Sequence, residues 1–171
     1  ALVDFVLSLH LWFHYDAAAG TDQFTEKVAW LFNGQVSYHM SMDGISLVLV
    51  MLTTFLGPLV ILSTWKAVTD RVADFLGFVL LLQTAMLGTF FARDMLLFYV
   101  FWEAMLIPMF LIIGVWGGER RVYAALKFFL YTFVGSVLML IAILYLFFAG
   151  GETFNMALLP QLIIDPKVQV W

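Results

Sequence analysis

One stretch of 22 residues, Met95–Trp116, restricts most strongly what this chain can fold into. It reads MLLFYVFWEAMLIPMFLIIGVW and carries a single charge, that of Glu103. About 20 apolar residues are enough to span the hydrocarbon core of a bilayer as a helix. Glu103 is the ninth residue of the stretch, so it lies roughly 12 Å along the helix, well inside the membrane. A carboxylate at that depth costs at least ~2.5–3.5 kcal/mol on insertion scales, so we expect it to have a partner or a function.

A proline follows Glu103 in the same stretch, at position 108. A proline inside a helix has no backbone N–H to donate and clashes with the carbonyl four residues earlier, which here belongs to Ala104. The carboxylate therefore lies next to a backbone carbonyl that is free to bind water. We interpret this arrangement as a site that holds a proton or a water chain inside a membrane. The alternative is a structural glutamate, either protonated or bonded to a neighbouring helix.

The composition supports a membrane protein and excludes several other classes. Of the 171 residues, 64% are hydrophobic and 12% are charged, against about 45–50% and about 25% in soluble domains. The net charge of −4 and the lack of a basic stripe argue against nucleic-acid binding. The chain has no cysteine, which excludes disulfides, thiolate zinc sites and cysteine-ligated iron–sulfur clusters within it. It has no glycine-rich nucleotide-binding motif, so we expect it to hold no cofactor of its own.

The hydropathy pattern predicts an all-α, polytopic transmembrane helix bundle with four complete spans and one partial span. We expect a single membrane domain over 1–171 that is a fragment of a longer bundle. Asp43 suits the N-cap of one helix, and Asn33-Gly34 is a turn signal in the preceding loop. A further helix could open at 168–171. The predicted helices are about 1–15 (partial), 45–64, 75–92, 95–116 and 123–148, and the loops are 16–43 and 149–171.

The loop charges predict an orientation in the membrane. The loops after residues 64 and 116 lie on one side and share four basic residues, whereas the other side holds Arg93 and the acidic loop 16–43. The excess of positive charge on cytoplasmic loops places the first side in the cytoplasm or the mitochondrial matrix. The acidic loop then faces the periplasm or the intermembrane space. The four basic residues are Lys66, Arg71, Arg120 and Arg121.

Two further charged residues are candidates for a polar path. Lys127 lies roughly 7 Å in from the cytoplasmic face and either extends its side chain to the interface or lines a path within the bundle. Roughly 10 Å of depth separates it from Glu103 in a core about 30 Å thick, so water or another residue has to lie between them. Asp94 is either the N-cap of the helix that carries Glu103 or a proton-entry group.

Two histidines are the candidates for a metal or haem site. His10 and His14 are four residues apart, so they share a helix face. No third ligand is evident, and the pair lies near the membrane interface. We expect packing at the interface rather than metal binding, and we predict no metal site in the chain.

Three segments of the chain closely resemble one known family. They read DGISLVLVMLTTFLGPLVIL at 43–62, FYVFWEAMLIPMFLIIGVWGG at 98–118 and AALKFFLYTFVGSVLMLIAIL at 124–144. The family is the antiporter-like membrane subunit M of NADH–quinone oxidoreductase, respiratory complex I, called chain 4 in mitochondria. The resemblance covers about residues 43–148. Its block W-E-x-M-L-x-P-M distinguishes subunit M from the sister subunits L and N.

The resemblance implies a subunit of about fourteen transmembrane helices, of which this chain would supply helix two in part and helices three to six. Members of the family translocate protons, driven by quinone reduction in another arm of the complex. Their helix-five glutamate matches Glu103 and is thought to pair with a lysine on helix seven, which this chain lacks. Lys127 matches a frequent helix-six lysine. The implied partners are the other membrane subunits of complex I, lipid, water and protons, while NADH, FMN, iron–sulfur clusters and quinone bind to other subunits.

The resemblance places the chain in a bacterial plasma membrane or a mitochondrial inner membrane, as a subunit of a translocating NADH–quinone oxidoreductase without a redox centre of its own. Two other interpretations remain. One is a subunit of a multi-chain cation/proton antiporter with the same ancestral fold. The other is a membrane scaffold without transport activity, against which the buried carboxylate of Glu103 argues.

Overall fold

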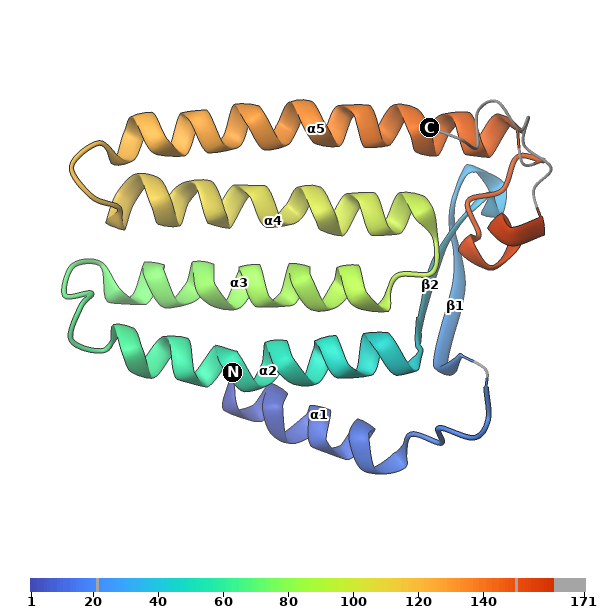
Figure 1. Ribbon diagram of the computed structural model, residues 1–171, viewed down its shortest axis with the longest axis horizontal. Coiled ribbons are helices and arrows are strands. Elements are labelled where there is room, and N and C mark those ends of the chain that lie inside the picture. Colours follow the sequence, from blue (N-terminus) through green and yellow to red (C-terminus); the bar gives the residue numbers. More distant parts are fainter. Residues whose placement is uncertain (21, 150, 162–171) are drawn as a thin grey trace.

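Four long antiparallel helices form the body of the protein in this computed structural model, which describes residues 1–20, 22–149 and 151–161. Each helix packs mainly against its neighbours in the sequence, and Figure 1 shows them side by side. All four are long and apolar enough to cross a membrane, which confirms the predicted helical bundle with four complete spans. They are α2 (Gly44–Thr64), α3 (Val72–Phe91), α4 (Met95–Trp116) and α5 (Arg121–Ala149).

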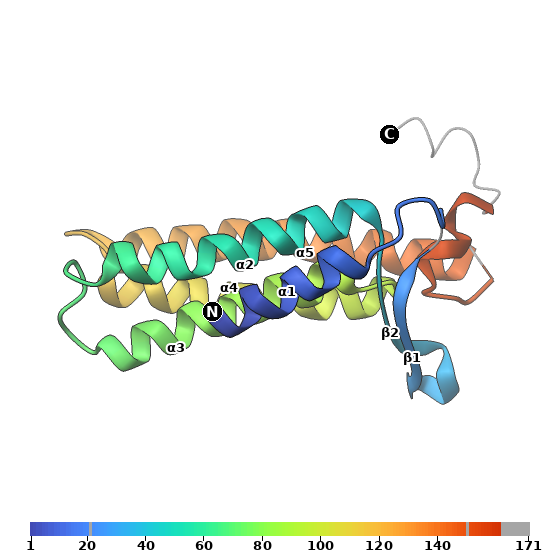
Figure 2. The same ribbon diagram turned by 90° about the horizontal axis from the view of Figure 1, so that it is seen from below.

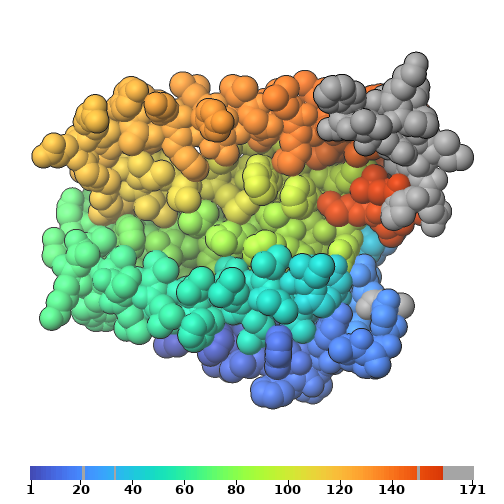
Figure 3. Space-filling model, in the orientation of Figure 1, coloured from blue at the N-terminus to red at the C-terminus, as the bar shows by residue number. Residues whose placement is uncertain are grey.

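A shorter helix, α1 (Leu2–His14), lies along the outer side of α2. Its 13 residues are too few to cross the hydrocarbon core, since a helix rises by about 1.5 Å per residue. Figure 3 shows that α1, in blue, covers α2 only over part of its length, toward one end of the bundle. This short apolar helix lies at the position of the predicted partial first span, which stays a prediction.

The segment expected to be a loop over 16–43 contains a β-hairpin, so that prediction is wrong. β1 (Gln23–Leu31) pairs antiparallel with β2 (Val36–Met42), and a short 3₁₀ turn, η1 (Phe32–Gly34), connects them. The Asn33-Gly34 signal does mark this turn. The strands flank it with aromatic and β-branched residues, the composition that favours strands, and an Asn-Gly pair between two such runs is a strong hairpin signal. The all-α description thus holds for the helices that cross the membrane but not for this hairpin.

The hairpin lies at one end of the bundle, opposite the turns that follow α2 and α4 (Figures 1 and 2). Its second strand is attached to the tight connection between α3 and α4. The Arg93 amide donates to the His39 carbonyl, and the Met95 amide donates to the Phe154 carbonyl. The connection therefore lies between β2 and the segment before η2 (Met156–Gln161) and forms an isolated antiparallel bridge with each. We call the hairpin together with 92–95 and 154–156 the end cap. The helix proposed at 168–171 lies outside the described residues.

Candidate functional site

Glu103 lies on α4 where this helix faces α5. The side chain is half-buried, and its Oε1 atom is buried without a hydrogen-bond partner among the described residues. The Tyr99 hydroxyl, one helical turn earlier, lies beside both the Glu103 carboxylate and the Ser136 hydroxyl of α5. Ser136 itself is buried and donates to the Phe133 carbonyl. Buried polar atoms without partners are rare in proteins and are typical of functional sites or of sites that bind water.

α4 continues through Pro108, which is fully buried. Because the proline has no N–H, the Ala104 carbonyl one residue after Glu103 loses its helical partner. The site thus combines an acid, a free carbonyl acceptor and two hydroxyl groups within about two turns of α4 and the facing turn of α5. The carboxyl and hydroxyl groups can exchange a proton with one another or with water, and the carbonyl can accept a hydrogen bond from that water.

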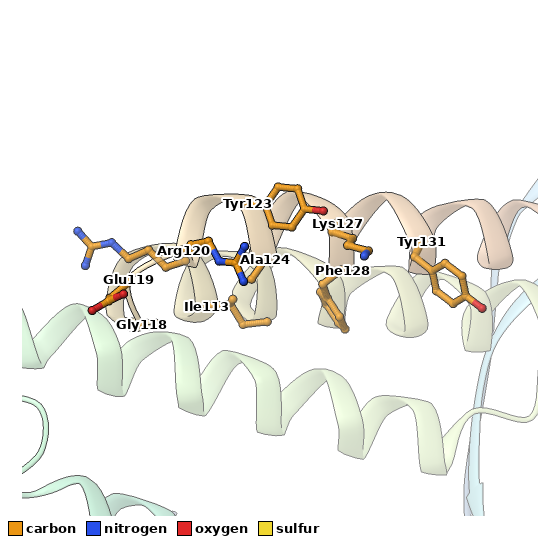
Figure 4. A pocket seen from close by; sticks show the side chains of 11 residues that line it. Ile113, Gly118, Glu119, Arg120, Tyr123, Ala124, Lys127, Phe128 and Tyr131 are labelled. Carbon is orange, nitrogen blue, oxygen red and sulfur yellow. The ribbon is translucent and has the colours of Figure 1, made fainter.

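Lys127 lies on α5 toward the opposite end of the bundle from the end cap. Its side chain is exposed, and its Nζ atom lies 5.9 Å from the centre of the Tyr123 ring. It lines a hollow of about 620 Å³ beside the turn between α4 and α5, together with Tyr123 and Tyr131. Figure 4 shows Tyr123, Lys127 and Tyr131 following one another along α5, while the Arg120 side chain extends away from them.

Three hollows follow α5 from Lys127 toward Ser136. The hollow of about 620 Å³ shares Lys127 and Tyr131 with a second one of about 570 Å³. That second hollow shares Tyr131 and Gly135 with a third of about 280 Å³, which Ser136 also lines. The three hollows thus share lining residues along the outer side of α5 between Lys127 and Ser136, although the lining of the second is mostly apolar and Glu103 lines none of the three.

The structure does not join Glu103 and Lys127 in an ion pair; the ion pairs of the described residues involve Arg71, Arg93 and the terminal amine. Nine residues, roughly 14 Å along α5, separate Lys127 from Ser136, whose hydroxyl lies beside Tyr99. Sequence reasoning selected the acid and the base but missed Tyr99 and Ser136. A hydroxyl one turn before Glu103 could have been noticed, whereas Ser136 becomes relevant only through helix packing.

Asp94 is the N-cap of α4, one of its two predicted roles. Its Oδ1 atom accepts from the amides of Leu96 and Leu97, at 3.0 and 3.2 Å. Its Oδ2 atom accepts from the amide and the hydroxyl of Ser37 in β2. Both oxygens are occupied and the residue is 1% exposed, so Asp94 fixes the hairpin to the start of α4.

Arg93, next to this cap, pairs with the two acids that flank the hairpin in the sequence. Its Nη2 atom lies 2.8 Å from Asp22 and 3.1 Å from Asp43, the N-cap of α2. Burial by itself raises the pKa of Asp43, but hydrogen bonds from Ser46 and the Arg93 charge outweigh it and hold that pKa below its ordinary value. Because its charge is compensated, Arg93 does not contradict the predicted orientation.

His10 and His14 share a face of α1, with ring centres 4.0 Å apart. Both are exposed, and the His14 Nδ1 atom lies 2.9 Å from the His10 carbonyl. Across the described part of the chain, no group of three or more potential metal ligands occurs.

Comparisons with known proteins bear on this arrangement. A family model described as NADH-ubiquinone oxidoreductase chain 4, amino terminus, matches residues 23–89. A second one, described as NADH:quinone oxidoreductase/Mrp antiporter, TM, matches residues 92–167. NADH-quinone oxidoreductase subunit M of Rhodobacter capsulatus is 51% identical over 152 residues, which cover 89% of this chain and 29% of the relative. The chain belongs to the family of subunit M and chain 4 of NADH–quinone oxidoreductase.

Solved structures agree with this family and extend the fold beyond it. Respiratory complex I from Thermus thermophilus contains a chain that matches 94% of this one with a TM-score of 0.77 and 35% identity, over 33% of its own length. The Mrp complex from Dietzia sp. matches 98% of this chain with a TM-score of 0.80 at 22% identity, over 18% of that chain, and so shares the fold. The predicted antiporter-like membrane fold is confirmed. The chain spans about a third of the length of the relatives it matches.

Proposed function

We propose that this chain forms part of a proton-translocating membrane subunit of NADH–quinone oxidoreductase and that Glu103 carries the proton. The observation that supports this most directly is the buried, partnerless Oε1 atom of Glu103 on a membrane-spanning helix, beside the Tyr99 hydroxyl. A carboxylate at this depth is costly, so its retention favours a role in transport. Its relatives are subunits of the same oxidoreductase.

In this proposal, a proton enters from the cytoplasm or the mitochondrial matrix at Lys127. It then passes along the hollows beside Tyr131 toward Ser136 and Tyr99 and reaches Glu103. Hydroxyl side chains and intervening water relay the proton, because no direct Lys127–Glu103 pair exists in the described part of the chain. A change in charge near Glu103 makes it bind or release the proton, since charges act strongly on one another in a bundle of low dielectric constant.

The oxidoreductase activity belongs to the assembly. NADH, FMN, iron–sulfur clusters and quinone bind to other subunits, and the described residues contribute helices, a path and a proton carrier. The partners of the chain are the other membrane subunits of the complex. Its membrane is a bacterial plasma membrane or a mitochondrial inner membrane.

A second candidate function is proton exchange in a multi-chain cation/proton antiporter. The description of the family model that matches residues 92–167 names both the oxidoreductase and the Mrp antiporter, and the Mrp structure has the same fold. The two functions differ in what drives transport: quinone reduction in the first, and a gradient of another cation in the second. A scaffold without transport would need neither a buried acid nor hydroxyl groups beside it.

Replacement of Glu103 in the full-length subunit of the assembled complex tests the proposal. Glu103→Gln keeps the size and a hydrogen-bonding side chain but cannot release a proton, so we expect NADH-driven proton uptake into membrane vesicles to be lost while the complex still assembles. Glu103→Asp keeps the acid and should retain part of the pumping. Thr84→Val is a matched control, since Thr84 lies on α3 and donates only to the Leu80 carbonyl of its own helix.

Two outcomes would overturn or redirect the proposal. Normal pumping by Glu103→Gln would remove Glu103 as the proton carrier. Proton movement that follows a sodium or potassium gradient and does not respond to NADH would favour the antiporter.

A further inference from the structure

A second carboxylate, Asp4, lies on a membrane helix of the bundle, on a different side from Glu103. It is on α1, the partial span, and its Oδ2 atom accepts a hydrogen bond of 3.2 Å from the Gln83 amide nitrogen of α3. Among the described residues, no Lys, Arg or His side chain forms an ion pair with Asp4. The Gln83 bond is the one that ties Asp4 to another helix.

The depth of this contact follows from its partners on the spanning helices. Gln83 is the twelfth residue of α3, so it lies roughly 16 Å from one end of this helix and 12 Å from the other. One turn after Asp4, the Ser8 hydroxyl lies 2.7 Å from the Thr54 hydroxyl, which is at the midpoint of α2. Figure 1 likewise shows the N-terminal end of α1 beside the middle of α2. Asp4 is therefore near the centre of the membrane, where carboxylates are rare and usually functional.

The Gln83 side chain is buried in the interface between α3 and α2. It is 5% exposed, and its Oε1 atom is buried without a partner among the residues that the structure describes. That oxygen faces α2 at Gly57, where a Cβ atom would overlap it. A buried amide with one end used and the other end free has an unsatisfied hydrogen-bonding group that calls for an explanation.

An amide beside an acid can serve both charge states of that acid. Its N–H₂ group donates to an ionised carboxylate, and its oxygen accepts from the O–H of a protonated one. Rotation of the Gln83 amide exchanges the two ends. Gly57 leaves space for either end, and both residues line a largely apolar hollow of about 470 Å³ between α2 and α3.

We propose that Asp4 and Gln83 form a second proton-binding site at mid-membrane, in which Asp4 binds the proton and the Gln83 amide turns to stabilise either charge state. The ligand is a proton, alone or with a water molecule. The Glu103 site lies between α4 and α5, whereas this site lies between α1 and α3. It requires the membrane placement of the bundle but does not depend on the oxidoreductase assignment.

Infrared difference spectroscopy against pH, on the full-length subunit in its purified membrane assembly, tests this site. All variants carry Glu103→Gln, which removes the carboxyl group of the Glu103 site from the spectrum. We expect a band of a protonated carboxyl group that titrates with pH and is lost in Asp4→Asn. In Gln83→Leu we expect the band to shift in frequency and in titration midpoint. Asp74→Asn is the matched control, because Asp74 is an exposed acid paired with Arg71, and it should leave the band in place.

The possible results separate clearly. A spectrum unchanged by Asp4→Asn would overturn the site, and an unchanged frequency and midpoint in Gln83→Leu would overturn the role of the amide. If Asp4→Asn fails to assemble, Asp4→Glu still decides, because it should move the band without removing it. Failure of the Glu103 proposal would show as normal pumping in Glu103→Gln, which leaves the Asp4 band unaffected.

Discussion

The end cap and the middle of the bundle differ in how completely their buried polar side chains are hydrogen-bonded. In the end cap, Asp94 uses both carboxylate oxygens and Arg93 bonds to Asp22, Asp43 and Ser41. In the middle of the bundle, the Oε1 atoms of Glu103 and Gln83 have no partner within the described part of the chain. Saturated groups hold elements together, whereas groups kept at depth without saturation are typical of sites that bind or move something. The two regions of the chain thus differ in how completely their buried polar groups are paired.

The strongest test of the comparison is Asp94→Ala. Four donors lose their acceptor at once, in a place that is almost fully buried, namely the amides of Leu96, Leu97 and Ser37 and the Ser37 hydroxyl. We expect the unfolding free energy of the full-length subunit in detergent to fall by about 3 kcal/mol, because buried donors without partners are costly.

The matched control for Asp94→Ala is Asp43→Ala. Asp43 also caps a helix but is partly exposed and bonds to the Ser46 amide. Its loss should lower the unfolding free energy by about 1 kcal/mol, the usual effect of a lost N-cap. Equal effects of the two substitutions in denaturant titrations would contradict the idea that the end cap depends on its saturated acid.

The second test concerns apolar packing in the bundle. A Cβ atom at Gly88 would overlap the Phe101 ring across the α3–α4 contact. We expect Gly88→Ala to lower the unfolding free energy by about 2 kcal/mol, the usual effect of forcing extra atoms into a packed interface. Gly77→Ala on the same helix meets open space and should not destabilise the protein. An unchanged unfolding free energy in Gly88→Ala would mean that the α3–α4 contact is loosely packed at this position.

The smallest effect is a pH dependence that originates in the end cap. Burial, and next the Lys27 charge, lower the pKa of His39 below its ordinary value of 6.5, although Asp22 and Asp94 oppose this. Between the lowered pKa and 6.5, the unfolded chain binds more protons than the folded one, so stability falls as the pH decreases through this window. Denaturant titrations at several pH values should show this slope in the wild type.

Two variants sharpen the His39 prediction. His39→Gln should remove its contribution to the slope, because the side chain can no longer bind a proton. Lys27→Met should make it shallower, because one of the charges that lower the pKa is gone. A slope that is the same in all three proteins would exclude His39 as its source. The His39 Nδ1 atom is also the exception in the end cap, as a buried atom without a partner among the described residues.

Hydropathy alone was sufficient to locate the spanning helices, and the helix at Met95–Trp116 was predicted to the residue. In a membrane each segment has to satisfy its own backbone hydrogen bonds, so the information for a spanning helix is local. The caps at Asp43 and Asp94 were predictable for the same reason, since a cap bonds to amides two or three residues away. Glu103 was recognisable because a charge in an apolar run is conspicuous.

Contacts between distant residues could not be obtained in this way. The hairpin was missed because the backbone hydrogen bonds of a strand are made with the other strand and not within the strand itself. The Asn33-Gly34 turn between the strands was nevertheless visible in the sequence. Asp4 was not selected from the sequence, because its partner Gln83 lies 79 residues further along the chain and only folding brings the two together. Ser136 joined the Glu103 site only because α4 and α5 pack face to face. Which polar groups meet at depth is decided by how whole helices pack, and that depends on every side chain of the interface at once.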